Sequence, residues 1–262
     1  MNNFERILKK INGFKLKSPN YFTNAYIEVS ALFQLLERET TEIYETERSV
    51  AVFFEDNGVH RLYAFAETAE IAAGVKLPQS RDNVIFEIIE QDKNNALTDC
   101  FVSNGWEVYQ NLMQLRNVVP LNYAPSMADT PVEIAGLDDA EAVYQMLFDT
   151  FDINVSHLPN KGQLKENIAK GETLIIRDRD KIAAFAIFET TGKKTKYWYQ
   201  LVVGKDYRGK NYAQALTEFE FLRVDSGTIY SIWVPADYPP VINLHKKNGA
   251  KEYPRYLTVF FK

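Results

Sequence analysis

The chain has 262 residues, of which 46% are apolar and 25% charged, and its formal net charge is −5. This length suits two compact domains, and the composition is ordinary for a soluble globular protein. The acidic balance argues against a nucleic-acid-binding protein, which usually presents a basic face.

The few cysteines and histidines limit metal and redox chemistry. The single cysteine, Cys100, excludes an intramolecular disulfide and a cysteine-rich metal site. None of His60, His157 and His245 has a neighbouring His or Cys at ligand spacing, so we expect no metal. The amino-terminal residues contain no apolar segment of signal-peptide length, and no run could span a bilayer. We therefore expect a reduced, cytoplasmic protein without a membrane partner.

The first half reads as a mixture of helices and strands. Asp56-Asn57-Gly58 lies between two apolar runs, which is the strongest short signal for a β-hairpin. Asn104-Gly105 marks a helix end, because glycine favours the left-handed position just past a helix. The predicted helices cover residues 4–11, 31–37, 67–73 and 94–103, and extended segments cover 84–89 and 106–115.

The segment 118–130 contains Pro120 and Pro125 and has no clear period, so it predicts a linker. We assign residues 1–120 to a first domain, 121–130 to the linker and 131–262 to a second domain.

The second half alternates strands and helices. Asp138 and Asp139 open a helix, because their side-chain oxygens can satisfy the free amides of its first turn. A later helix carries an apolar stripe formed by Tyr212, Ala215, Leu216, Phe219 and Leu222. The predicted strands are 132–135, 173–177, 182–188, 196–203, 228–234 and 256–261, with a helix at 163–169 and another at 241–248.

Two stretches of the chain, residues 83–109 and 227–253, align with each other without a gap. In both, an Asn-Gly pair ends a helix that follows a strand. The hairpin of residues 53–64 aligns in turn with residues 175–184, which predicts that the first half lacks a counterpart of residues 188–210. The sequence therefore indicates a duplicated fold with a reduced first copy.

The segment with the clearest chemistry follows the strand that ends at Val203. It places Arg208, Gly209 and Lys210 directly before a helix. The first amides of a helix lack internal partners, and the helix dipole adds positive charge there. A pyrophosphate docked at this point would accept several backbone hydrogen bonds.

This segment resembles the cofactor signature of the GNAT superfamily of N-acetyltransferases, R-x-x-G-x-G/A. Here it reads Arg208-Gly209-Lys210-Asn211-Tyr212-Ala213, with Asn211 where the family usually has glycine. Asn tolerates left-handed backbone angles better than most residues. The element order of residues 130–262 also resembles the family. The resemblance implies an α/β (α+β) fold with a mixed, mostly antiparallel central sheet flanked by helices, in two tandem domains.

The resemblance also implies acetyl-CoA, or another acyl-CoA, as co-substrate, and direct attack of a primary amine on its thioester. The free backbone groups of Leu201, Val202 and Val203 would pair with the pantetheine arm. The pyrophosphate would be bound by Arg208, Gly209, Lys210, Asn211, Tyr212 and Ala213.

The family's proton donor is often a Tyr in a stretch like L-Y-x-x-x-G-F. Here His245 takes the Tyr position and Ala250 the aromatic one. An imidazole could donate to a thiolate or accept from an amine. Equally, His245 could pack in the core with no chemical role.

The general base is less clear, because residues 196–203 contain no carboxylate. Gln200 and Tyr199 could position a water, and Glu189 is the nearest carboxylate, although a strand end is commonly just solvated. The aromatic side chains Tyr197, Trp198, Trp233 and Tyr238 could line an acceptor pocket or belong to the core.

Three functions remain open at this stage: an N-acyltransferase, a CoA-binding regulatory module without catalysis, and an aminoacyl-tRNA-dependent transferase. The acidic balance disfavours the last, so we expect no nucleic-acid partner. We expect a small-molecule or peptide amine as acceptor, and a homodimer stays open. The first half has no arginine-glycine turn, so we assign it no cofactor; it either completes an acceptor pocket or only packs.

Overall fold

The computed structural model describes residues 3–77, 83–91, 96–126 and 129–262. Asn94 and Asn95, at the predicted start of a helix, and Met127 and Ala128, in the predicted linker, lie outside this set. The chain forms two compact units: unit 1 runs up to Asn111 and adds Arg255–Lys262, whereas unit 2 is Leu112–Pro254. No helix in the described ranges is long and apolar enough to cross a membrane.

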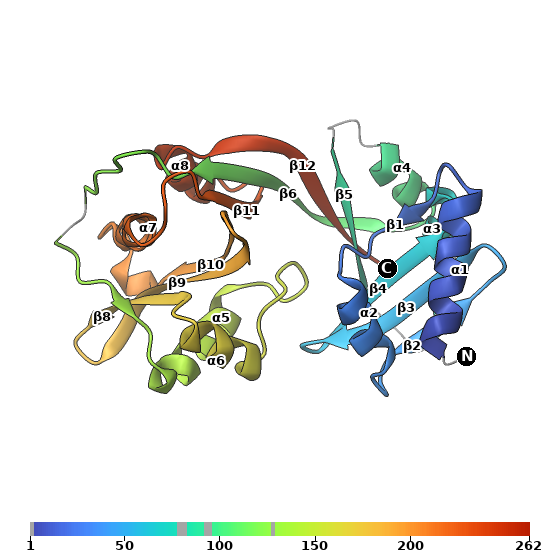
Figure 1. Ribbon diagram of the computed structural model, residues 1–262, viewed down its shortest axis with the longest axis horizontal. Helices are drawn as coiled ribbons and strands as arrows, with labels where there is room; N and C mark the ends of the chain where they lie inside the picture. The colour runs from blue at the N-terminus through green and yellow to red at the C-terminus, as the bar shows by residue number, and fades with distance from the viewer. Residues whose placement is uncertain (1–2, 78–82, 92–95, 127–128) are drawn as a thin grey trace. The chain divides into compact units, whose positions relative to one another are not determined.

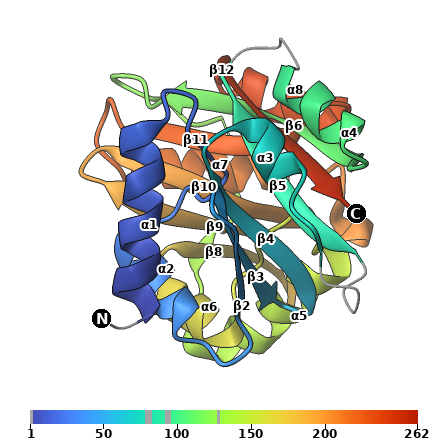
Figure 2. The same cartoon turned by 90° about the vertical axis from the view of Figure 1, so that its right-hand side faces the viewer.

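Unit 1 is a sheet with helices on both faces. Its strand order is β2-β3-β4-β5-β12, with β1 paired to β4, and among the described pairings of this unit β4–β5 is parallel and the others are antiparallel. Helices α1 and α2 pack on one face and α3 and α4 on the other (Figure 2). The elements are α1 (Asn3–Lys17), β1 (Phe22–Thr23), α2 (Val29–Leu36), β2 (Glu42–Glu45), β3 (Ser49–Asp56), β4 (Val59–Ala66), α3 (Ala69–Ala73), β5 (Val84–Glu90), α4 (Ala96–Ser103) and the long strands β6 (Glu107–Val118) and β12 (Lys251–Phe261).

The predicted hairpin of unit 1 is confirmed as β3 and β4. Asn57 and Gly58 connect the strands with φ values of 51° and 82°. Two positive φ values in a two-residue loop match the twist of a hairpin, which explains why Asn-Gly stands there.

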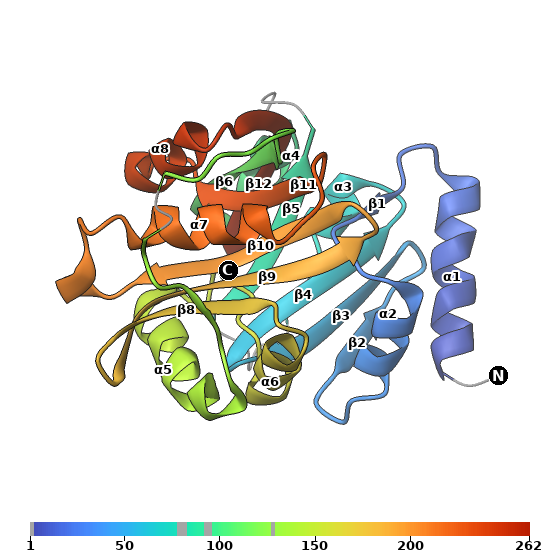
Figure 3. The ribbon, with the colours of Figure 1, turned by 60° about the vertical axis from the view of Figure 1, so that its left-hand side comes forward.

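Unit 2 has the same layered arrangement. Its strand order is β6-β11-β10-β9-β8-β7, and of the pairings that the structure describes here β10–β11 is parallel and the others are antiparallel. Helix α7 lies along one face of β9 and β10, with α5 and α6 on the other face (Figure 3). The remaining elements are β7 (Glu133–Ile134), the short 3-10 helix η1 (Leu137–Asp139), α5 (Ala140–Thr150), α6 (Lys161–Ala169), β8 (Thr173–Asp178), β9 (Lys181–Gly192), β10 (Thr195–Val203), η2 (Lys205–Tyr207), α7 (Tyr212–Leu222), β11 (Ile229–Pro235) and α8 (Pro239–Lys247) (Figure 1). The mostly antiparallel sheet flanked by helices confirms the predicted fold class.

The two repeats of the sequence exchange their last strands. Residues 112–118 of β6 pair antiparallel with β11 in unit 2. Residues 256–261 of β12 pair antiparallel with β5 in unit 1. The two aligned stretches of the sequence correspond to β5–α4–β6 and β11–α8–β12. Strand β6 of the first copy therefore joins the sheet of the second copy, and strand β12 of the second copy joins the sheet of the first. The compact units therefore divide the chain differently from the predicted ranges 1–120 and 131–262.

One part of the predicted alignment is wrong. The hairpin β3–β4 occupies the place of β9–β10, not of β8–β9, because β4 and β10 are the strands that pair parallel with β5 and β11. The first copy does not lack the counterpart of 188–210 as a block. Instead, Glu67 and Thr68 alone connect β4 to the short helix α3, where unit 2 has the loop 204–211 and the longer α7.

The predicted apolar stripe of α7 is only partly right. Ala215 and Leu216 are buried, but Leu222 is 56% exposed. A second, polar side of the helix is also buried. Its residues are each at most 7% exposed: Gln214, Thr217, Glu218 and Glu220. Hydrogen bonds within α7, together with a hydrogen bond from β11 and an ion pair with β10, make this burial tolerable.

Candidate functional site

The strands β10 and β11 pair only at their beginnings. Their parallel register covers Thr195↔Ile229 to Tyr197↔Ser231 and then ends. Against β9, strand β10 has an irregularity between Trp198 and Gln200, which is the position of a β-bulge. A bulge bends its strand and ends pairing locally. Residues 200–203 thus keep β9 as a neighbour but have no described pairing with β11, which leaves their backbone groups on that edge available to a ligand.

Beyond Val203, a tight loop leads into α7. Gly209 has φ +81°, and Asn211, the residue before the helix, has φ 60° and ψ 20°. A Cβ at Gly209 would meet nothing within 4 Å, so the glycine serves the left-handed backbone rather than a close approach. Asn211 adopts the left-handed conformation that it tolerates better than most residues.

The first amides of α7 are available for a ligand. The side chain of Asn211 makes no capping hydrogen bond. Among the described residues, no backbone carbonyl accepts from the N–H groups of Tyr212, Ala213 or Gln214, and the first bond of the helix runs from Ala215 to Asn211. Unpaired amides at a helix start attract anions, and the helix dipole adds to this.

A pocket of about 300 Å³ lies at this helix start. This volume is at the lower end of the range for ligand pockets. Its lining comes from β10, the loop, the first turn of α7, and α8: Val203, Tyr207, Arg208, Gly209, Asn211, Tyr212, Ala213, Gln214, Leu244 and Lys247.

The charge around the pocket is positive. Arg208 and Lys247 both line it, from the loop and from the last turn of α8. The Lys210 ammonium lies 5.2 Å from the ring centre of Tyr207 and 5.9 Å from that of Tyr212. Aromatic rings attract such a cation and hold it near the loop. Cations and free amides at one pocket fit the phosphates of a nucleotide.

Most of the predicted cofactor residues meet at this pocket. Val203, Arg208, Gly209, Asn211, Tyr212 and Ala213 line it, whereas Leu201, Val202 and Lys210 do not. Leu201 packs on the α7 side of the sheet, and Val202 is buried on the α5–α6 side. Only backbone atoms of Val202 could therefore serve a ligand on the α7 side, which is the use expected for that residue.

His245 is buried in α8, with 2% of its surface exposed. Its ring packs at 86° against Trp198, with 4.6 Å between ring centres. Burial lowers the pKa of His245 from 6.5 to about 4. The imidazole is therefore neutral at pH 7, where it has a lone pair to accept a proton but no extra proton to donate.

The other two predicted catalytic residues differ in their exposure to solvent. Gln200 on β10 is 6% exposed, in keeping with a fixed side chain. Glu189 on β9 is exposed and stands opposite Tyr197 in the strand register. Glu189 thus has the solvent contact of an ordinary strand-end carboxylate.

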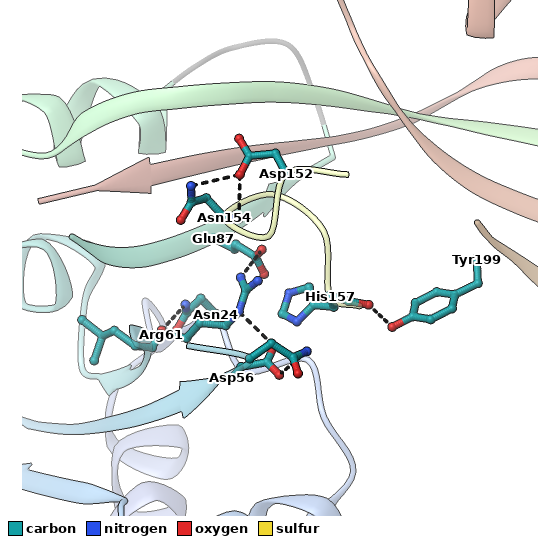
Figure 4. Close-up of polar contacts among 10 residues, drawn as sticks. Asn24, Asp56, Arg61, Glu87, Asp152, Asn154, His157 and Tyr199 are labelled. Carbon is teal, nitrogen blue, oxygen red and sulfur yellow. Dashed lines mark hydrogen bonds and ion pairs between the residues drawn. The ribbon is translucent and has the colours of Figure 1, made fainter. Parts of the chain in front are cut away.

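Two of the predicted acceptor-pocket aromatics come together. The ring centres of Tyr197 and Tyr199 lie 5.9 Å apart. The Tyr199 hydroxyl donates to the backbone carbonyl of His157, in the segment after α5 (Figure 4). Trp233 is half-buried on β11, and Tyr238 is 48% exposed just before α8. Trp198 belongs to the core under α7.

Unit 1 holds its own buried ionic group. Arg61 on β4 is 3% exposed and donates to Asp56 at 3.1 Å and Glu87 at 3.0 Å (Figure 4). Asn24 bridges the Leu62 carbonyl and the Ala64 N–H of the same strand. These contacts fix β4 and β5 together. No group of three or more metal-ligating side chains occurs in the described part of the chain.

Four lining residues are not among those that the sequence predicts for the site: Tyr207, Gln214, Leu244 and Lys247. Gln214 and Tyr207 directly flank the signature, so their place in the loop is a usable signal. Leu244 and Lys247 are three residues apart on α8 and so share a helix face. Nothing in their sequence indicates that this face meets α7.

Residues 140–250 match the family model of the acetyltransferase (GNAT) family. No curated protein matches the chain significantly.

Solved structures with similar folds cover nearly the whole chain. One is a GCN5-related N-acetyltransferase from Sphaerobacter thermophilus, with 11% identity, a TM-score of 0.58 and coverage of 93% of this chain and 96% of that one. Another is a tandem GNAT protein from the clavulanic acid biosynthesis pathway, with 10% identity, a TM-score of 0.57 and coverage of 99% and 94%. A third is the GCN5-related glucosamine N-acetyltransferase region of a fungal multi-domain GH3 beta-N-acetylglucosaminidase, with 10% identity, a TM-score of 0.67 and coverage of 100% and 37%. These identities show the fold alone, and that fold agrees with the predicted tandem architecture.

Proposed function

The chain contains a GNAT acetyltransferase domain at residues 140–250, and from this we propose that unit 2 is an acyl-CoA-dependent N-acyltransferase. The family and fold support acyl transfer from CoA in general. The finer proposal is transfer of an acetyl or other short acyl group to a primary amine of a small molecule or peptide. The observation that carries it is the pocket at the start of α7, where free amides and two cations meet.

The residues of this pocket fit the diphosphate of CoA. The N–H groups of Gly209, Asn211 and Ala213 would donate to its oxygens, and Arg208 would neutralise its charge. Lys247, on the facing helix, adds a second cation that could contact a further phosphate. The unpaired edge of residues 201–203 would pair with the amide groups of the pantetheine arm, as an added strand does.

When bound, the acyl-CoA supplies an activated thioester carbonyl. The amine nitrogen then forms a bond to the acyl carbon, the C–S bond breaks, the nitrogen loses a proton and the sulfur gains one. The protein must orient the two reactants and manage those two protons.

Of the two roles expected for His245, we keep proton acceptance, although a pKa of about 4 makes the imidazole a weak base and its side chain does not line the pocket. A pKa of about 4 leaves the imidazole neutral, so it offers a lone pair rather than a proton at pH 7. Gln200, held in the buried part of β10, would position a water. Glu189 would act through that water. Tyr197, Tyr199, Trp233 and Tyr238 remain our candidates for the acceptor pocket.

The test is release of free thiol from acetyl-CoA in the presence of a library of primary amines. We expect release that depends on one class of amine and on intact Arg208. Wild-type protein that binds acetyl-CoA but releases no thiol with any amine would contradict the catalytic part of the proposal.

A second function has a specific observation in its favour. His245 stands where the family often has a Tyr, and its burial removes the easily titrated proton of an imidazolium. A CoA-binding regulatory module without catalysis is consistent with this. The same assay separates the two functions, because that module binds CoA at unit 2 without amine-dependent thiol release.

A further inference from the structure

The side chains of Gln214 and Asn248 are hydrogen-bonded to each other in both directions. Gln214 Nε2 donates to Asn248 Oδ1 at 2.5 Å, and Asn248 Nδ2 donates to Gln214 Oε1 at 3.0 Å. Gln214 lies in the first turn of α7, and Asn248 is the residue that ends α8. A reciprocal pair of amide bonds fixes both the distance and the relative orientation of its two partners.

This pair leaves Gln214 little capacity to bind a ligand directly. Its Nε2 also donates to Glu218 Oε1 at 2.8 Å, so both amide hydrogens are used. A carboxylate only accepts, so Glu218 decides which end of the Gln214 amide carries the nitrogen. The residue is 7% exposed although it lines the pocket. Gln214 therefore contributes to the pocket through its placement rather than through a free polar group.

Both ends of the pair are fixed to further parts of unit 2. Glu218 accepts from the Ser126 N–H at 2.7 Å and from the Ser126 hydroxyl at 2.5 Å. Asn117 Nδ2, on β6, donates to the Asn248 carbonyl at 2.5 Å. Asn248 Nδ2 also donates to the Leu244 carbonyl within α8. The pair is therefore the centre of a connected, partly buried network.

The network joins the two walls of the pocket. Asn211, Tyr212 and Ala213 line it from the start of α7, and Leu244 and Lys247 line it from α8. The reciprocal amide bonds connect these same two segments. The separation of the helix amides from the cation of Lys247 thus depends on this contact.

We propose that Gln214 and Asn248 are positioning residues that clamp the start of α7 to the end of α8 and thereby set the affinity of unit 2 for CoA. This inference rests on the proposed CoA site. It assigns a role to two residues that would not touch the reacting atoms. Ser126 and Glu218 extend the clamp to the segment that follows β6.

The test compares Gln214→Leu with the exchange variant Gln214→Asn/Asn248→Gln. Leucine has similar size but no amide, whereas the exchange keeps one amide on each helix. We expect Gln214→Leu to raise the Kd for CoA, measured by titration calorimetry, about tenfold, which is within the range of coupled neighbouring groups. We expect the exchange variant to recover most of that loss.

Thr217→Val is the matched control. Thr217 is fully buried on the same helix, and its hydroxyl donates to the Ala213 carbonyl, not to α8. A merely structural role for Gln214 predicts that both single variants lower Tm and leave the Kd for CoA unchanged. The clamp predicts that only Gln214→Leu raises the Kd for CoA and the KM for acetyl-CoA.

The outcomes separate the two proposals. If wild-type protein binds no CoA, the CoA site fails and the clamp fails with it. If wild-type protein binds CoA and folded Gln214→Leu binds it equally well, the clamp alone is overturned. The clamp is also contradicted if the exchange variant keeps the wild-type Tm but its Kd for CoA is as high as that of Gln214→Leu.

Discussion

His245 packs edge-to-face against Trp198, with 4.6 Å between the ring centres, and each residue is only 2% exposed. Neither His245 Nε2 nor Trp198 Nε1 has a hydrogen-bond partner among the described residues. Ionisation of an imidazole in such surroundings is costly, because burial removes the water that would solvate its charge. This relationship explains why the pKa of His245 falls to about 4.

The stability of the protein should therefore depend on pH through His245. The unfolded chain takes up a proton there near pH 6.5 and the folded chain only near pH 4. Protonation then favours the unfolded state as the pH falls from about 6.5 to 4. We expect His245 to account for a loss of about 2 kcal/mol between pH 7 and pH 5, measured by denaturant unfolding.

The variant His245→Phe supplies the comparison for that measurement. Phenylalanine keeps an aromatic ring against Trp198 but cannot titrate. We expect the difference in the free energy of unfolding between pH 7 and pH 5 to be smaller in the variant than in the wild type. An identical pH dependence in both proteins would show that His245 titrates normally in the folded state.

Asn211 gives a prediction about the backbone of the cofactor loop. Its φ of 60° and ψ of 20° are left-handed, so alanine should be strained there and glycine should not. We expect Asn211→Ala to lower the free energy of unfolding by about 1 kcal/mol and to weaken CoA binding. Asn211→Gly should retain CoA binding. Equal effects of the two variants on Kd would mean that the left-handed angle is irrelevant to the site.

The carboxylate of Glu220 gives a prediction about stability alone. It is fully buried, pairs with Lys196, and accepts from the Tyr230 hydroxyl at 3.0 Å. Burial and then the charge of Glu220 raise the pKa of Tyr230, so that its hydroxyl stays a donor. Lys196→Met would leave Glu220 with the more exposed Arg223, 3.3 Å away, as its counter-charge, and we expect a loss of up to about 3 kcal/mol in chemical denaturation.

A double variant tests the reason for that loss. Lys196→Met/Glu220→Met removes the buried carboxylate together with its lysine and leaves the partly exposed Arg223, so it should recover part of the stability lost by the single variant. A double variant less stable than Lys196→Met would show that the ion pair itself is strongly stabilising. The exposed pair of Lys161 and Glu141 is a useful control, and Lys161→Met should change stability little.

The sequence predicted local features well where the cause is local. The turn at Asn57-Gly58 follows from the backbone freedom of those two residues, and it appears with both φ values positive. The loop at Gly209 and Asn211 could be predicted for the same reason. The alternation of strands with amphipathic helices was enough to predict a mixed sheet with helices on both faces.

Features that depend on which elements meet could not be predicted. The exchange of β6 and β12 leaves no trace in a local pattern, because each strand would present the same residues to either sheet. The buried polar side of α7 has no local signal in the sequence, since Glu218 and Glu220 find partners such as Ser126 and Lys196 in distant parts of the chain. Lys247 likewise reaches the pocket only through the packing of α8 beside α7.

The central claim is that the start of α7 binds the diphosphate of CoA. Titration calorimetry of acetyl-CoA into wild-type protein, Arg208→Glu and the control Lys205→Glu tests it most directly, because Lys205 lies in the same loop but does not line the pocket. We predict saturable binding by wild type, a more than tenfold higher Kd for Arg208→Glu, and a much smaller change for Lys205→Glu. No binding by the wild type, or equal Kd values in wild type and Arg208→Glu, would contradict the claim.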